Sequence, residues 1–182
     1  GEAHRKLMGE FANANVLLAL LRDGFHPESH GGRVRLGGDG LPVLDYPLDD
    51  VFWEGARRAL LAMAEIQFAG GARWVAPVHE TVVGYTSWAE AKKGIAALPL
   101  KPFLCRVVSA HVMGGCGMAD SAQRGVVDHR GRHFWLDNLS VHDGSVFPTS
   151  LGVNPQLSIY GLTARNASLL AAELAGRPLP VL

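Results

Sequence analysis

Apolar residues at helical spacing predict the first helices of the chain. The segment 11–22 is rich in apolar residues and ends before Gly24, which predicts a helix. A second helix is predicted to begin after Asp49 or Asp50, either of which would cap it, and to end at the glycine pair 70–71. Its apolar face consists of Phe52, Ala56, Ala59, Leu60, Met63 and Phe68.

Short apolar runs between these helices predict strands. Residues 31–36 and 42–47 flank a Gly-Gly-Asp-Gly turn and predict a hairpin. Residues 73–78 predict a further strand. Ser87 and Glu90 form a capping box for a third helix, which is expected to run to about Ala97. The pattern is mixed α+β with antiparallel hairpins and lacks the alternation of a parallel sheet.

The pattern changes after Pro102. Residues 109–118 form a glycine-dense loop around a histidine, and residues 124–134 predict a strand, a turn at 130–131 and a second strand. A short strand at 139–142 leads into Asp143-Gly144-Ser145. A long helix is then predicted from about Asn154-Pro155 to Leu174. This strand, turn and helix are typical of the closing unit of a nucleotide-binding domain, which needs a sheet to dock on.

Composition narrows the class of protein. The chain has 182 residues, of which 48% are hydrophobic and 19% charged, as in ordinary globular domains. Its 17 basic and 17 acidic residues cancel, so neither nucleic acid nor an anionic membrane is expected as a partner. No apolar run approaches the ~20 residues of a membrane span, and no signal peptide is visible, so we expect a cytoplasmic location. Because the chain opens with Gly1 rather than Met, we expect it to be part of a longer protein.

Cysteines and histidines in the second half of the chain suggest a zinc site as one alternative. Cys116, His129 and His133 have zinc-finger-like spacing, with Cys105 as a fourth candidate ligand. We disfavour a metal site because the two cysteines are far apart and a glycine separates the histidines. Buried reduced thiols are favoured over a disulfide. Surface or structural roles are expected for His4, His26, His30, His79 and His142.

Four blocks follow one another in the last part of the chain. They are Ser109–Gly115 (SAHVMGG), Gly125–Asp128 (GVVD), Asn138–Ser150 (NLSVHDGSVFPTS) and Gly152–Ile159 (GVNPQLSI). In order and spacing they resemble the signature of the glucose–methanol–choline (GMC) oxidoreductases. The resemblance is specific over about residues 109–172 and looser over the first hundred residues.

The resemblance implies an FAD-dependent alcohol dehydrogenase or oxidase acting on CH–OH donors. Residues 1–108 would form the substrate-binding domain, an antiparallel sheet flanked by helices. Residues 109–182 would supply the catalytic segment and a strand–helix unit belonging to the FAD-binding domain. The G-x-G-x-x-G unit that holds the ADP half of FAD does not occur in this sequence. An amino-terminal FAD-binding domain of the same protein is therefore an expected partner, and this chain alone should bind FAD weakly.

Alcohol oxidation needs a base for the hydroxyl proton, a group that orients the oxygen and an acceptor for the hydride. By resemblance, His111 is the base and Asn154 orients the oxygen, while hydride passes to flavin N5. His111 could instead be a satisfied histidine in a glycine-rich turn, and Asn154 could simply cap the following helix. The resemblance also implies cofactor contacts from Asp143, Gly144, Asn154, Pro155 and Gln156. The helix amino terminus would favour an anionic flavin edge.

The sequence also allows an alternative function and a further partner. A stand-alone, non-catalytic interaction module is the alternative function, because the dinucleotide-binding unit is missing. The apolar residues Leu157, Leu162 and Leu170 expect a partner surface, which a homodimer could provide. A bulky or aliphatic alcohol is the expected substrate, and no residue separates a dehydrogenase from an oxidase.

Overall fold

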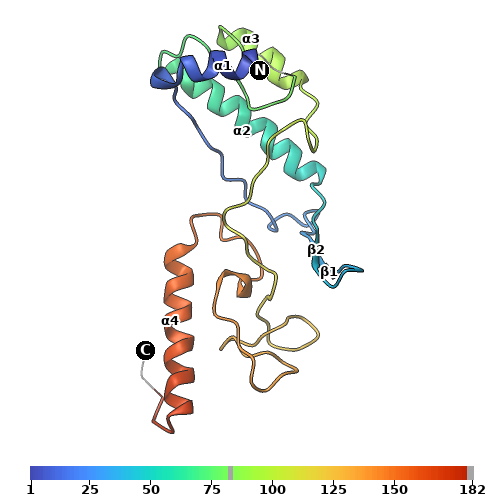
Figure 1. The fold of residues 1–182 in the computed structure, drawn as a ribbon, viewed down its shortest axis with the longest axis vertical. Coiled ribbons are helices and arrows are strands. Elements are labelled where there is room, and N and C mark those ends of the chain that lie inside the picture. Colours follow the sequence, from blue (N-terminus) through green and yellow to red (C-terminus); the bar gives the residue numbers. More distant parts are fainter. Residues whose placement is uncertain (82–83, 180–182) are drawn as a thin grey trace. The chain divides into compact units, whose positions relative to one another are not determined.

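A computed structural model describes residues 1–81 and 84–179 (Figure 1). It divides into two compact units. Unit 1 consists of Gly1–Leu21 and Leu48–Val108, and unit 2 of Arg22–Pro47 and Ser109–Leu182. No helix in the described part of the chain is long and apolar enough to cross a membrane.

Unit 1 is built on the helix pair α2 (Asp50–Ala69) and α3 (Trp88–Ala97), which lie against each other in Figure 1. The Asp49 carboxylate accepts the Phe52 N–H at 2.9 Å, and Gly70 and Gly71 close the far end of α2, so both predicted boundaries are confirmed. The buried core consists of Ala64, Val75, Ala91, Ile95 and Leu98.

The start of α3 is also confirmed, with one change in its capping. Ser87 Oγ accepts the Glu90 N–H at 3.3 Å, as a capping box requires. The Glu90 carboxylate reaches one residue further back than expected and accepts both the N–H (3.2 Å) and the hydroxyl (3.0 Å) of Thr86. These bonds lower the pKa of Glu90.

The predicted helix at 11–22 is wrong. A short helix α1 (Glu2–Gly9) precedes this segment, a 3-10 helix η1 covers only Phe11–Asn13, and residues 14–22 have no regular helix. A helix needs a surface on which to bury its apolar face, but Val16 and Leu18 are 76% and 83% exposed here. Instead, the Gln67 amide on α2 donates to the Asn15 carbonyl at 3.1 Å and holds the extended segment.

The predicted strand at 73–78 is reduced to one bridge. Val75 and Tyr85 exchange two backbone hydrogen bonds of 3.0 and 2.8 Å. Pro77 has no N–H and cannot extend this pairing as a ladder. The Trp74 indole packs over Gly84, where any Cβ would collide with it.

In unit 2, the predicted hairpin is confirmed as β1 (Arg33–Leu36) and β2 (Pro42–Asp45), paired antiparallel with Arg33 opposite Asp45. All eight residues are exposed, and no further strand joins the sheet in the described residues. Helices together with this small antiparallel sheet agree with the α+β class.

The predicted helix near the carboxyl end is confirmed as α4 (Gln156–Leu174), closed by Gly176 at φ +60°. The predicted strands at 124–134 and 139–142 are wrong. They appear as isolated bridges, among them Val127–His133 and Arg132–Ser140. Two backbone bonds flank the Val127–His133 bridge, from the Asp128 N–H to the Arg132 carbonyl at 2.8 Å and from the Phe134 N–H to the Val126 carbonyl at 3.2 Å. Gly131 lies in the turn between these arms with a φ of +78°.

Candidate functional site

The glycine-rich loop that follows His111 is bonded to the 3-10 helix η2 (Gly144–Val146). The Cys116 N–H donates to the Ser145 carbonyl at 3.0 Å, and the Met118 N–H donates to the Val146 carbonyl at 2.8 Å. Gly114 has a φ of +85° and faces the Pro148 carbonyl. The segment directly after the first motif block is therefore joined to the third block through their backbones.

Gly144 lies where three motif blocks meet. A Cβ on this residue would stand 3.0 Å from Ile159 Cδ1 on α4 and 3.2 Å from the Val112 carbonyl oxygen. Val112 directly follows His111, and Ile159 lies in the first turns of α4, which begins just after Asn154. The missing side chain lets the His111 loop, the Asp143–Gly144 turn and α4 pack closely together.

Asp143 uses its carboxylate within its own turn. Ser145 donates to it from its hydroxyl at 2.5 Å and from its N–H at 2.8 Å. These two bonds, with a smaller contribution from His142, lower the pKa of Asp143 against the opposing effect of burial. The described residues provide no acceptor for the Gly144 N–H, so the turn offers a ligand this backbone donor.

Neither the His111 nor the Asn154 side chain forms a hydrogen bond in the described part of the chain. His111 is half-buried, and no hydrogen bond to its ring forms within residues 1–81 and 84–179. Asn154 is exposed, and no side chain of the described residues caps α4, whose cap position is held by Pro155. The alternative role of Asn154 as a helix cap is therefore wrong. No hydrogen bond in the described chain joins His111 to Asn154.

The two residues after Asn154 have local partners. Pro155 is buried, and its carbonyl accepts the Ile159 N–H at 2.9 Å. The Gln156 amide donates to the Tyr160 hydroxyl at 2.7 Å on the exposed side of α4.

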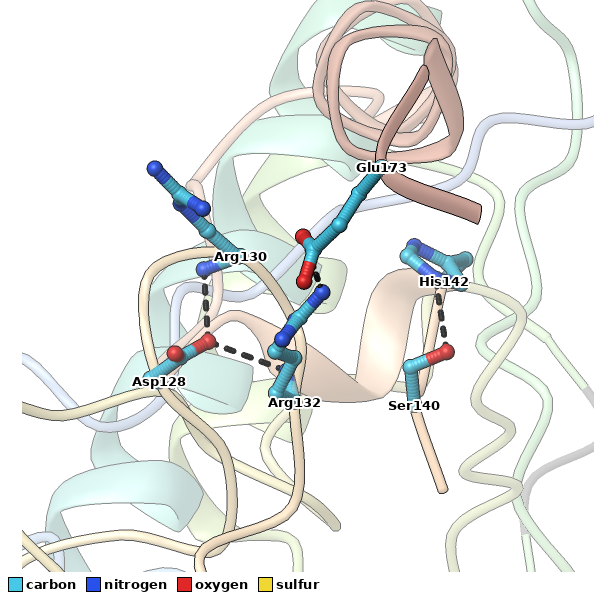
Figure 2. Close-up of polar contacts among 6 residues, drawn as sticks. All are labelled: Asp128, Arg130, Arg132, Ser140, His142 and Glu173. Atoms are coloured by element: carbon cyan, nitrogen blue, oxygen red, sulfur yellow. Dashed lines mark hydrogen bonds and ion pairs between the residues drawn. The ribbon is translucent and has the colours of Figure 1, made fainter. Parts of the chain in front are cut away.

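A polar cluster lies beside the segment that leads into Asp143 (Figure 2). The Asp128 carboxylate accepts the N–H groups of Arg130 (2.8 Å) and Arg132 (3.0 Å) and so shapes the turn between them. The Arg132 guanidinium is paired with Glu173 near the end of α4. This bond raises the pKa of Arg132 and lowers that of Glu173.

His142 lies in the same cluster, directly before Asp143. Its Nε2 is 3.0 Å from Ser140 Oγ, and its carbonyl accepts the Thr163 hydroxyl of α4 at 3.0 Å. Its Nδ1 is buried and has no hydrogen-bond partner in the part of the chain described. His142 thus has the structural position expected of it. No spacing rule in the sequence identified Thr163 as a partner of His142 or Glu173 as a partner of Arg132.

The remaining reactive groups form no further centre. Among the described residues, no three His, Cys, Asp or Glu side chains gather as metal ligands, and both cysteines are free. Burial raises the pKa of the Cys105 thiol. His79 is buried, with Nε2 at 3.2 Å from the Pro99 carbonyl and Nδ1 accepting the Thr81 N–H, as a structural histidine should be.

Comparison with known proteins gives consistent matches. A family model described as GMC oxidoreductase matches residues 27–163. An uncharacterized GMC-type oxidoreductase of Sinorhizobium fredii is 32% identical over 137 residues, which are 75% of this chain and 27% of that protein. A long-chain-alcohol oxidase of Arabidopsis thaliana is 30% identical over 162 residues, 85% of this chain and 21% of that protein.

A cholesterol oxidase of Acinetobacter baumannii is more similar over a shorter stretch. It is 49% identical over 65 residues, 36% of this chain and 12% of that protein. The chain spans at most 27% of the length of these three relatives. No solved structure matches the chain significantly.

Proposed function

This chain belongs to the GMC oxidoreductase family, as a carboxy-terminal portion, and we propose that the protein containing it oxidises an alcohol with the help of FAD. The proposal rests on the close approach of three motif blocks at Gly144. Three sequence blocks, separate along the chain, meet where one absent side chain leaves space between Val112 and Ile159. Nothing observed favours a non-catalytic module instead.

His111 is proposed to take the hydroxyl proton of the alcohol. A histidine suits this role because its ordinary pKa lies near neutrality. Its ring is half-buried and is not engaged by another side chain in the described residues, so a substrate hydroxyl would meet no internal competitor. The flanking glycines leave room for a flat ring close to the backbone.

Asn154 is proposed to orient the substrate oxygen. An amide can donate to this oxygen or accept from its proton without changing charge. Its side chain does not cap α4, which removes the local bond that would have kept it from a substrate.

The residues around Gly144 fit the cofactor expected of the family. Bound FAD would supply the two-electron acceptor, receiving hydride at N5. The unused Gly144 N–H would donate to the cofactor, and the Asp143 carboxylate would hold the turn in shape through Ser145. The amino terminus of α4, with Pro155 and Gln156, would present partial positive charge.

The remaining assignments follow the sequence motifs. We propose residues 1–108 as part of the substrate-binding domain and residues 109–182 as the catalytic segment with the closing unit of the FAD-binding domain. The compact units group residues 22–47 with the second part, so this boundary rests on the motifs rather than on compactness. The antiparallel sheet flanked by helices would be completed by the rest of the protein. A homodimer through Leu157, which is 83% exposed, stays a prediction.

The substrate class is proposed from the relatives. Their names give cholesterol and long-chain alcohols as what those proteins act on, and both are large and apolar. We therefore propose a bulky apolar alcohol as the substrate. The choice between oxidase and dehydrogenase would follow from whether oxygen reoxidises the reduced protein.

The test is flavin reduction in the full-length protein carrying His111→Ala. General-base catalysis contributes about 10²- to 10⁴-fold, so reduction by dodecanol or cholesterol, followed by anaerobic absorbance, should slow by at least about 100-fold. FAD content should stay close to that of the unsubstituted protein. His129→Ala, at an exposed position of the same unit, is the matched control and should reduce normally. Normal reduction in His111→Ala would remove this residue from the mechanism.

A further inference from the structure

The segment 22–25 packs directly on the loop that leads to Asn154. Gly152 has a φ of +72°, and a Cβ there would lie 2.5 Å from Arg22 Nε and 2.7 Å from Arg22 Cδ. On the other side, Gly24 has a φ of +80°, and its Cβ would lie 3.3 Å from Thr149 Cβ. Each segment thus places a glycine against a side chain of the other, and both belong to unit 2.

The Arg22 guanidinium stacks on an aromatic ring of its own segment. Its guanidinium carbon lies 3.5 Å from the centroid of the Phe25 ring, a cation–π arrangement. No carboxylate in the described residues comes within ion-pair distance of Arg22. Its orientation therefore depends on the aromatic ring beneath it and on the Gly152 backbone beside it.

Residues 23–29 form a turn that is held by hydrogen bonds among themselves. The Gly24 N–H donates to the Asp23 carboxylate at 2.7 Å and to Ser29 Oγ at 3.3 Å, and the Ser29 hydroxyl donates to Asp23. Arg22 and Phe25, which are both exposed, therefore flank a hydrogen-bonded turn.

Residues 149–152 make no side-chain hydrogen bond to another segment in the described part of the chain. Their side-chain hydrogen bonds are local, from the Gly152 N–H to Ser150 Oγ at 3.2 Å and from the Thr149 hydroxyl to the Ser150 carbonyl at 2.9 Å. Asn154, two residues after Gly152, is exposed and does not cap α4. The position of Asn154 is therefore set by the path of this loop on one side and by buried Pro155 on the other.

We propose that Arg22 is a positioning residue for Asn154, acting by covering Gly152 while stacked on Phe25. The inference rests on the proposed function, in which Asn154 orients the substrate oxygen. A misplacement of about 1 Å in such a group can lower a rate by about 100-fold. Arg22→Ala should therefore lower the rate constant for flavin reduction by roughly 10- to 100-fold. FAD content and the melting temperature should change little, and KM should change less than kcat.

The conservative substitutions separate the parts of the contact. Arg22→Lys retains a cation and a long aliphatic stem and should restore part of the lost rate. Arg22→Gln retains a shorter aliphatic stem and no charge, and should resemble Arg22→Ala. Loss of rate accompanied by loss of FAD or by a collapsed melting temperature would contradict positioning, because it would indicate only a folding defect.

A double-mutant cycle tests the contact itself. Gly152→Ala should impair reduction because the new Cβ meets Arg22 and because its backbone is left-handed. In the double variant Arg22→Ala/Gly152→Ala the collision is absent, so the combined loss should be smaller than the product of the single losses. Gly31→Ala is the matched control, since its φ is +66° and no atom lies within 4 Å of its Cβ. Its effect should be unchanged by Arg22→Ala.

The outcomes distinguish this inference from the function on which it rests. Normal flavin reduction in Arg22→Ala, with impaired reduction in His111→Ala, would overturn the positioning role alone. Independent effects of Arg22→Ala and Gly152→Ala would do the same. Normal reduction in His111→Ala would instead contradict the proposed function.

Discussion

The carbonyl oxygen of Val112 lies 3.2 Å from the point where a Cβ atom on Gly144 would stand. Since Val112 follows His111 and Gly144 follows Asp143, this one approach joins the proposed catalytic loop to the proposed cofactor turn. Ile159 Cδ1 closes the other side at 3.0 Å. An isoleucine methyl group can yield to a new atom, whereas a backbone carbonyl yields only if its loop moves.

Gly144→Ala should therefore push the His111 loop away from the turn. Overpacking of this kind costs about 1–3 kcal/mol, and we expect a value near the lower limit because Ile159 can adjust. The free energy of unfolding and the FAD content of the full-length protein should both fall. Gly161→Ala is the control in α4: no atom lies within 4 Å of its Cβ, and removing a helical glycine should stabilise by about 0.5–1 kcal/mol. Equal behaviour of the two variants would refute the close packing at Gly144.

Arg57 should be the most sensitive arginine of unit 1. Its guanidinium donates to the carbonyls of Ile95 (2.7 Å), Ala96 (2.9 Å) and Leu98 (3.0 Å), which end α3. Arg57→Ala should lower the free energy of unfolding by about 2 kcal/mol, because these carbonyls, two of them in partly buried bonds, lose a charged donor. Arg58→Ala should change it by less than about 0.5 kcal/mol, since within the described residues Arg58 makes only an exposed contact of 3.8 Å with Glu54. Denaturant unfolding of both variants makes the comparison, and a smaller loss in Arg57→Ala than in Arg58→Ala would contradict it.

Elements whose signals lie within their own sequence could be predicted. Asp49 and Ser87 cap α2 and α3 as expected, and the β1–β2 hairpin surrounds a glycine-rich turn. The segment 11–22 could not be predicted correctly, because a helical apolar pattern forms a helix only where a surface covers it. Exposed Val16 and Leu18 have no such surface.

The candidate site also contains residues that local sequence could identify and contacts that it could not. His111, Asp143 and Asn154 were identified from local motifs, and their roles stay predictions. Their surroundings depend on long-range contacts: Arg132 and Glu173 are 41 positions apart, and Arg22 meets Gly152 from the other end of the chain. No helical or strand spacing in the sequence relates the two members of either pair, so these contacts could be identified only from the tertiary structure.

The Asp143 turn should make stability depend on pH in the acidic range. Bonds from Ser145 lower the pKa of Asp143, so the folded state binds its proton less readily than the unfolded chain does. This contribution is fully present above the unfolded pKa of about 3.9 and is lost as the pH falls through the lower folded value. Ser145→Ala should raise the pKa of Asp143 and lower stability at pH 7, with a smaller effect as the pH falls below the unfolded value. Unfolding measured across this range, with a loss that is equal at both ends, would refute the linkage.

Asn154→Ala provides a test that separates chemistry from helix capping. A side-chain cap is worth about 1 kcal/mol, but no side chain caps α4, so the substitution should leave the free energy of unfolding unchanged within about 0.3 kcal/mol. Asp49→Ala is the matched comparison, because Asp49 does cap α2 through the Phe52 N–H and its loss should cost about 1 kcal/mol. If Asn154 orients the substrate oxygen, Asn154→Ala should still slow flavin reduction, whereas Asp49→Ala should not. A destabilisation of Asn154→Ala equal to that of Asp49→Ala would return Asn154 to a capping role, and an unchanged reduction rate would remove it from the site.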